Sequence, residues 1–105
     1  MQYLHLCFQS SAFGREGNQA MGKDPEFLKQ QILREMLQIR RQKAGLSQRQ
    51  LAKILDKPQS WVCRHERGDL RMDYMELRAY LKAIGASVVA FVSALERKLA
   101  EVDEE

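Results

Sequence analysis

The segment PQSWVCRHERG, residues 58–68, carries many side chains that can form hydrogen bonds and few that can be buried. Gln59 and Arg64 have planar polar heads that can make two hydrogen bonds to one planar partner, and Ser60 can both donate and accept. Trp61 adds a large ring with a single N–H donor. A segment of this composition is suited to contacting a polar surface, provided that neighbouring elements hold it outward.

Covalent or metal chemistry is not supported by the spacing of the reactive residues. Cys63 and His65 lie in the same segment, but neither has a partner group at a spacing that would build a nucleophile with its base or a metal site. We therefore expect no enzymatic activity, no metal and no cofactor. His65 is expected to be a packed, hydrogen-bonded histidine, and a redox role for Cys63 is the less favoured alternative.

Length and charge set further limits. A chain of 105 residues can form one small domain. Its formal net charge is only +3, but residues 40–71 hold nine basic and three acidic side chains, a balance of +6. The last ten residues hold five acidic and two basic side chains, a balance of −3. This asymmetry predicts a middle region that faces a polyanion, although a solvated surface has the same charge pattern.

The expected location of the protein in the cell follows from its hydrophobic stretches, its first residues and its cysteines. No stretch has the length of a membrane span, and the first residues lack the cationic start of a signal peptide. Cys7 and Cys63 provide no disulfide framework, which favours a reducing cytoplasm. Residues 1–23 are expected to be a flexible extension, and whether translation begins at Met1 or at Met21 stays open.

Capping residues and helical spacing predict five helices and no strand, hence an all-α fold. The first helix should begin at Pro25, capped by Asp24, and stop at Gly45. The remaining starts are Ser47 with Gln50, Pro58, Asp73 with Glu76, and Ser87, and the remaining stops are Gly68 and Gly85. On the third helix, Val62, His65 and Glu66 share one side and should dock, while Ser60, Cys63, Arg64 and Arg67 face outward.

The stretch AGLSQRQLAKILDKPQSWVCRHERG resembles the Cro/C1-type helix-turn-helix family, also called the xenobiotic-response-element-like (XRE) family. The resemblance extends over about residues 33–84 and implies a five-helix, lambda-repressor-like DNA-binding domain with a long terminal helix. It divides the chain into an extension (1–23), a helix-turn-helix domain (24–86), and a C-terminal helix with an acidic tail (87–105). Asp56 replaces a common turn glycine, and Pro58 replaces the usual hydroxyl cap.

The resemblance also implies roles for single residues. Gln59, Ser60 and Arg64 would read bases in the major groove of double-stranded DNA, with glutamine suited to adenine and arginine to guanine. Gln48 would grip a phosphate at the start of the second helix, and Lys57, Arg67 and Arg71 would contact the backbone. Arg41 and Glu66 would form a structural ion pair. Trp61 is expected to reach the DNA backbone or a thymine methyl group, with core packing as the alternative.

The fifth helix raises the question of assembly. Its apolar stripe exceeds what a four-helix core needs, so we expect a homodimer on a palindromic operator, with an interface formed by Phe91, Val92, Leu95 and Leu99. The alternative is that the stripe closes the core of one chain. The expected function is a sequence-specific transcriptional repressor. The other function that the sequence permits is an antitoxin-type protein that binds a toxin and regulates its own operon.

Overall fold

The computed structural model describes residues 24–103. Within this range the chain forms helices and no strand, so the predicted all-α fold is confirmed for the described residues. The helices are α2 (Pro25–Lys43), α3 (Gln48–Leu55), α4 (Gln59–Arg67), α5 (Tyr74–Ala83) and α6 (Val88–Asp103). The expectations for the extension, including the choice between Met1 and Met21, lie outside the described residues.

Four of the five predicted helix starts are confirmed by hydrogen bonds at the caps. The Asp24 side chain accepts from the Glu26 backbone N–H ahead of α2. Complete capping boxes start α3 and α5, formed by Ser47 with Gln50 and by Asp73 with Glu76. Ser87 accepts from the Ala90 N–H at the start of α6. These bonds satisfy backbone N–H groups that have no partner inside the helix. Because the capping residues are close in sequence, the helix starts can be predicted from the local sequence.

The two departures from the family pattern have local structural consequences. Asp56 ends α3 in the left-handed conformation at φ 57°, a region that aspartate enters more readily than most residues. Pro58 precedes α4 and makes no side-chain cap bond. Gly68 ends α4 at φ 96°, and a Cβ there would come within 2.8 Å of the Arg34 guanidinium. The left-handed backbone therefore favours glycine at position 68, whereas the Arg34 head is the end of a flexible side chain that can move aside.

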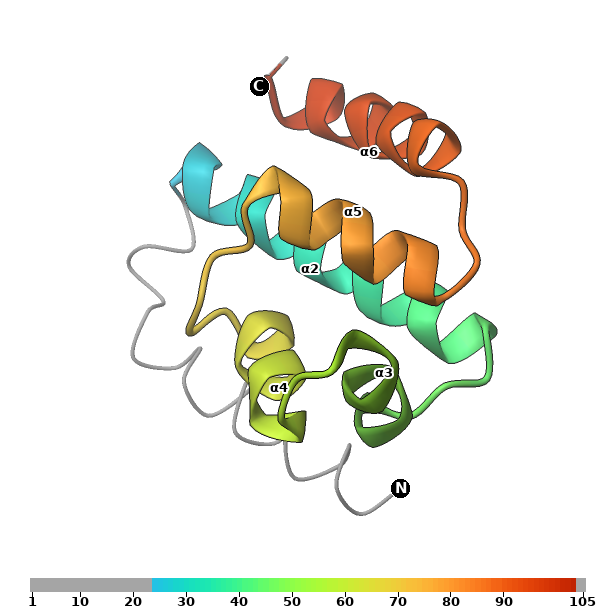
Figure 1. Ribbon diagram of the computed structural model, residues 1–105. Helices are drawn as coiled ribbons and strands as arrows, with labels where there is room; N and C mark the ends of the chain where they lie inside the picture. Colours follow the sequence, from blue (N-terminus) through green and yellow to red (C-terminus); the bar gives the residue numbers. More distant parts are fainter. Residues whose placement is uncertain (1–23, 104–105) are drawn as a thin grey trace.

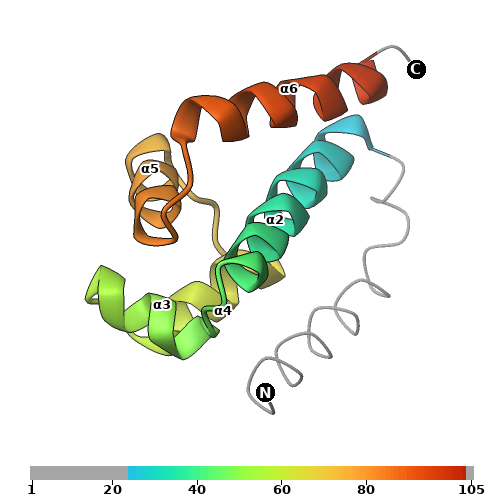
Figure 2. The ribbon, with the colours of Figure 1, turned by 90° about the vertical axis from the view of Figure 1, so that its right-hand side faces the viewer.

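The helices enclose one core (Figure 1). α3 and α4 form one end of the molecule, where α4 packs against α2 and α3 packs against α5, and α6 covers the opposite end, mainly against α2 (Figures 1 and 2). Near its C-terminus α6 meets the start of α2, where Lys29 pairs with Asp103. The buried apolar side chains come from every helix: Leu37, Leu51, Ala52, Val62, Tyr80, Leu81, Phe91 and Leu95.

The position of α6 changes the expectation for the dimer interface. Phe91 is fully buried and Leu95 is 8% exposed, and both belong to the core of the single chain. Val92 and Leu99 are half-buried and pack against that core. Phe91 and Leu95 therefore help to close the core of the single chain, and the homodimer interface stays a prediction. Phe91 and Leu95 cannot form an intermolecular interface without opening the domain.

Among the described residues, no single helix is long and apolar enough to cross a membrane. α5 and α6 meet that length and composition test only when taken together, across a bend of 116°.

Candidate nucleic-acid interface

The inward side of α4 consists of the three residues predicted from the helical wheel. Val62 enters the core, and His65 and Glu66 are also buried. The His65 Nδ1 lies 2.9 Å from the Trp61 carbonyl oxygen, and its Nε2 lies 3.8 Å from Oε1 of Glu76 on α5. His65 is thus packed and hydrogen-bonded, as expected. One edge of α4 is enough to dock it, which leaves the other edge for contacts.

The ion pair expected between Arg41 and Glu66 is present and buried. Arg41 Nε donates to Glu66 Oε2 at 2.7 Å, and its second guanidinium nitrogen donates to Oε1 at 3.1 Å. Arg41 also donates to the Leu46 carbonyl at 2.8 Å, so it ties α2 both to α4 and to the loop before α3. The two side chains are 0% and 5% exposed. A bidentate pair in this setting fixes angle as well as distance between the helices.

Tyr80 of α5 completes the environment of Glu66. Its hydroxyl donates to Glu66 Oε2 at 2.6 Å and lies 3.3 Å from the Leu37 carbonyl. Burial, reinforced by the Glu66 carboxylate, raises the pKa of Tyr80 above its ordinary value, so its proton stays on the oxygen. This role of Tyr80 was not predicted, because nothing near Tyr80 in the sequence marks it as a partner of a residue on α4.

Gln48 is placed differently from the expectation that its side chain grips a phosphate. The residue is 2% exposed, and its Nε2 donates to Glu66 Oε1 at 2.9 Å. Its Oε1 accepts from Gln59 Nε2 at 2.7 Å. The physical reason is that the buried carboxylate needs another donor, and Gln48 at the start of α3 supplies it. Gln48 therefore connects Glu66 to Gln59 instead of facing outward.

The outward side of α4 carries the other predicted contact residues. Ser60 and Arg64 are exposed, and Gln59 is half-buried at the first position of the helix. Lys57 and Arg71, just before and after α4, are exposed as well. Arg67 is half-buried and pairs with Asp69, which neutralises part of its charge. The structure therefore brings most of the predicted residues to one side, with Arg67 the least available cation.

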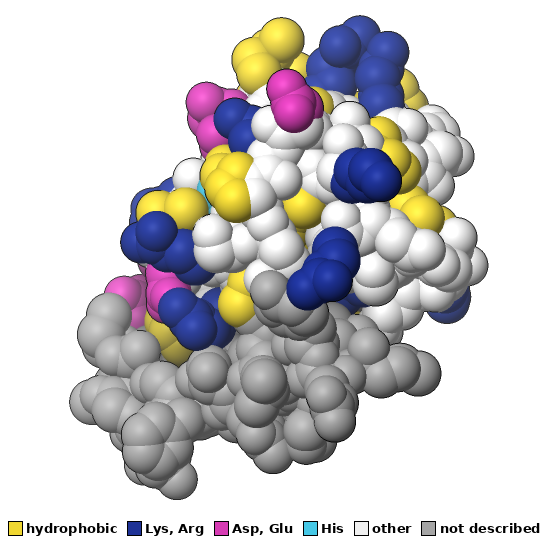
Figure 3. All heavy atoms as spheres, turned by 60° about the horizontal axis from the view of Figure 1, so that its bottom comes forward, with side chains coloured by type: hydrophobic (Ala, Val, Ile, Leu, Met, Phe, Trp, Pro, Cys, Tyr) yellow, Lys and Arg dark blue, Asp and Glu magenta, His cyan; other side chains and the backbone are white. Residues whose placement is uncertain are grey.

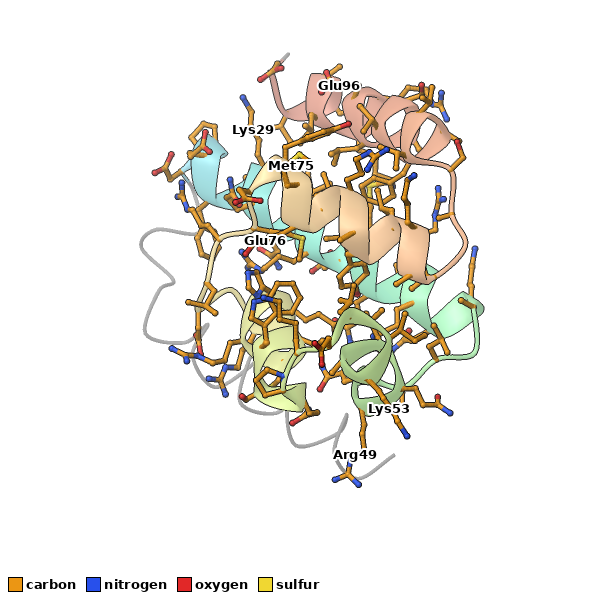
Figure 4. All side chains as sticks on the ribbon, viewed as in Figure 1. Lys29, Arg49, Lys53, Met75, Glu76 and Glu96 are labelled. Carbon is orange, nitrogen blue, oxygen red and sulfur yellow. The ribbon has the colours of Figure 1, made fainter. Side chains whose placement is uncertain are left out.

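Two further basic residues were not singled out from the sequence. Arg49 and Lys53 are four residues apart on α3 and exposed, and both extend away from the domain at the end formed by α3 and α4 (Figure 4). The space-filling view of this end shows lysine and arginine side chains scattered across its surface (Figure 3). The spacing of four residues on a predicted helix was the available signal.

Trp61 occupies an intermediate position. It is half-buried and packs against the core, its ring lies 4.2 Å from the His65 ring between centroids, and Lys57 Nζ lies 5.5 Å from the Trp61 centroid. One side of the ring therefore supports the fold, as the core alternative required. Its DNA contact remains a prediction.

Within residues 24–103, no three His, Cys, Asp or Glu side chains could hold a metal ion. Cys63 is disulfide-bonded, contrary to the expectation from cysteine usage, and the expectation for Cys7 lies outside the described residues.

The part of the chain that is similar to known proteins includes α3 and α4. Residues 32–99 match the helix-turn-helix domain family. The structure is similar to that of an XRE-family like protein from Pseudomonas syringae pv. tomato str. DC3000, with a TM-score of 0.67 and 33% sequence identity. That similarity covers 70% of this chain and 89% of the other. The chain belongs to the XRE-type helix-turn-helix family.

Membership of the XRE-type family supports a DNA-binding regulator as the class of function. A search of curated proteins found no match. In the XRE-type arrangement, α3 and α4 are the helix-turn-helix, and in proteins with this motif the second of its two helices lies in the major groove. The buried residue Glu66 and the exposed residues Ser60 and Arg64 therefore lie on opposite sides of α4.

Proposed function

We propose that this XRE-type protein is a sequence-specific transcriptional repressor that acts by occupying an operator. The observation that carries the proposal is the two-sided character of α4: Val62 and Glu66 anchor it, while Ser60 and Arg64 are exposed. Arg64 can bond both acceptors of a guanine, and Gln59 can pair with adenine. A rigidly anchored helix with polar side chains outward is what base reading requires.

Phosphate contacts would supply most of the affinity. The exposed cations around α4 are Arg49, Lys53, Lys57, Arg64 and Arg71. The start of α3 would place backbone N–H groups toward a phosphate, and Gln48 would act by holding Gln59. Because each neutralised phosphate releases counterions, binding should weaken steeply as salt rises.

A dimer on a palindromic operator remains part of the proposal, but it needs a different surface from the buried stripe of α6. Val89 on the first turn of α6 is 77% exposed, and Val92 is half-buried. We place the two-fold contact on this outward part of α6. On a palindromic operator, two copies would bind half-sites about 34–36 Å apart.

Selection of binding sites from random duplex DNA tests the proposal. A palindromic consensus is the expected result, and the absence of any enriched sequence would contradict it. Arg64→Ala should relax the preference at one base pair by about 1–3 kcal/mol. Arg97→Ala is the matched control, because Arg97 is an exposed arginine on α6, at the opposite end from α4, and should leave the consensus unchanged.

A further inference from the structure

We propose that Trp61 positions the Lys57 ammonium for a DNA phosphate, so that Trp61 contributes to DNA affinity through Lys57. This inference rests on the proposed function and makes Trp61 a positioning residue. It starts from the distance of 5.5 Å between Lys57 Nζ and the centroid of the Trp61 ring, which is within the range of a cation–π interaction. The two residues lie where the chain enters α4, the helix that carries the exposed residues Ser60 and Arg64.

The Trp61 ring is itself held in place. Its centroid lies 4.2 Å from that of the His65 ring, one turn further along α4. Both nitrogens of the His65 ring have neighbours, because Nδ1 lies 2.9 Å from the Trp61 carbonyl oxygen and Nε2 lies 3.8 Å from Glu76 Oε1. Trp61 also packs against the core. A ring with these contacts has little freedom to turn, so it offers the Lys57 ammonium a fixed face.

The Lys57 side chain also starts from an ordered backbone. The Lys57 N–H donates to the Ala52 carbonyl oxygen at 2.9 Å, across the left-handed residue Asp56 that ends α3. Ala52 is buried in the core. The Lys57 side chain is therefore held at its Cα by α3 and near its ammonium by Trp61. Ordering a long, flexible side chain in advance lowers the entropy cost of its contact with a phosphate.

An aromatic ring holds a cation without neutralising it, and this distinguishes Lys57 from Arg67. The Arg67 guanidinium pairs with the Asp69 carboxylate. Among residues 24–103, Lys57 belongs to no ion pair, and it is exposed. The Trp61 ring attracts the ammonium through its quadrupole and has no net charge to repel a phosphate. Lys57 is therefore a cation that is positioned, exposed and still charged, as a phosphate contact requires.

A double-mutant cycle on DNA affinity tests whether Trp61 acts through Lys57. Duplex DNA is titrated at several salt concentrations, at a temperature where every variant is folded. Lys57→Ala should reduce the salt slope by about 1, because one phosphate contact is lost. Trp61→Ala should weaken binding about 2- to 5-fold, the range for an exposed cation–π contact. In the Lys57→Ala protein, Trp61→Ala should have no further effect on affinity.

Control variants separate the aromatic ring from its bulk and Lys57 from other cations. Trp61→Phe keeps an aromatic face and should bind more tightly than Trp61→Met, which keeps apolar packing without a ring. Arg71→Ala is the matched control, because Arg71 is an exposed cation beyond the other end of α4. The losses from Arg71→Ala and Trp61→Ala should add.

Two outcomes of these titrations would overturn the inference. The first is an equal loss from Trp61→Ala with and without Lys57, because the ring would then contact DNA directly or act only through the fold. The second is wild-type affinity in the Trp61→Ala protein. Because phosphate contacts do not depend on base sequence, the cycle can be measured on any duplex that the protein binds.

A measurement without DNA separates this inference from the proposed function. Protons above an aromatic ring resonate upfield, so the ε-methylene protons of Lys57 should lie upfield of those of Lys53, an exposed lysine on α3, in NMR spectra of the free protein. Trp61→Met should remove this difference. Equal shifts in the wild-type protein would overturn the inference even if an operator is selected. Failure to select any DNA would overturn the proposed function, and the Lys57 shift would still report the position of its ammonium.

Discussion

α4 and α6 are both held by few residues, but by different forces. α6 is anchored by Phe91 and Leu95, whose burial is non-directional. α4 places Val62 in the core beside Glu66, which is bonded by groups from α2, α3 and α5. Apolar burial holds a helix near a surface, whereas bonds from three sides also fix its rotation. A helix that reads bases needs the second kind of anchor.

The largest expected effect breaks the polar anchor. Glu66→Ala leaves Arg41 buried without its carboxylate partner, and the protein should lose about 3–5 kcal/mol of unfolding free energy. Urea denaturation measures the loss. Arg67→Ala, whose target is a half-buried arginine paired at the surface with Asp69, is the control and should cost about 0–1 kcal/mol. Equal losses in the two variants would contradict the special role of the buried pair.

The next effect breaks the apolar anchor. Leu95→Ala removes a large core side chain from α6 and should cost about 2–4 kcal/mol, because it leaves a cavity that the neighbours fill only partly. Its base preference should match the wild type in the DNA selection, since α4 keeps its bonds. A changed consensus sequence for the Leu95→Ala variant would contradict the view that α4 is oriented by its polar bonds and not by the apolar packing of α6.

Tyr80→Phe tests the polar anchor through pH. A hydroxyl bonded to a charged group contributes about 1.5–3 kcal/mol below pH 10. Because the folded pKa of Tyr80 is raised, its unfolded form loses its proton first, and the stabilisation declines as pH rises above about 10. The difference between the urea midpoints of the wild-type and Tyr80→Phe proteins should therefore be smaller at pH 11 than at pH 8. A constant difference between them would contradict the assignment.

Trp61→Ala should cost less stability than the changes at Glu66, Leu95 and Tyr80. The ring is half-buried against the core and His65, so we expect a loss of about 1–2 kcal/mol, below the cost for a fully buried aromatic side chain. A larger loss would indicate that the Trp61 side chain serves the stability of the fold alone. Loss of DNA affinity beyond the loss in stability, measured by a binding titration at fixed salt, would support the predicted DNA contact.

The sequence predicts this fold well because its helix boundaries are local. The capping boxes at Ser47 and Asp73 and the stop at Gly68 need only neighbouring residues, and each is present. The inward side of α4 was also predictable from its 3.6-residue period. The partner Arg41 came from the family resemblance, and its bonds to Glu66 match that expectation.

The rest depends on contacts between distant segments. Whether Phe91 faced another chain or its own core was decided by how α6 crosses α2 and α5, and no local pattern encodes that crossing. From the sequence alone, Gln48 at a helix start is expected to bind a phosphate. Only the folded structure shows that it bonds Glu66, which also accepts from Tyr80. A buried polar network is assembled by the tertiary fold, so its members are visible only there.

The link from Glu66 to Gln59 has a consequence for how such a protein can diverge. In the proposed function the exposed residues Ser60 and Arg64 contact bases, so a mutation at either would change the preferred operator sequence while the fold persists. Gln59 shares its hydrogen bonds with the core, so changing it disturbs Gln48 and Glu66 as well. Duplicated copies of this gene would therefore acquire new operators first through Ser60 and Arg64, with the Gln59 base retained longest.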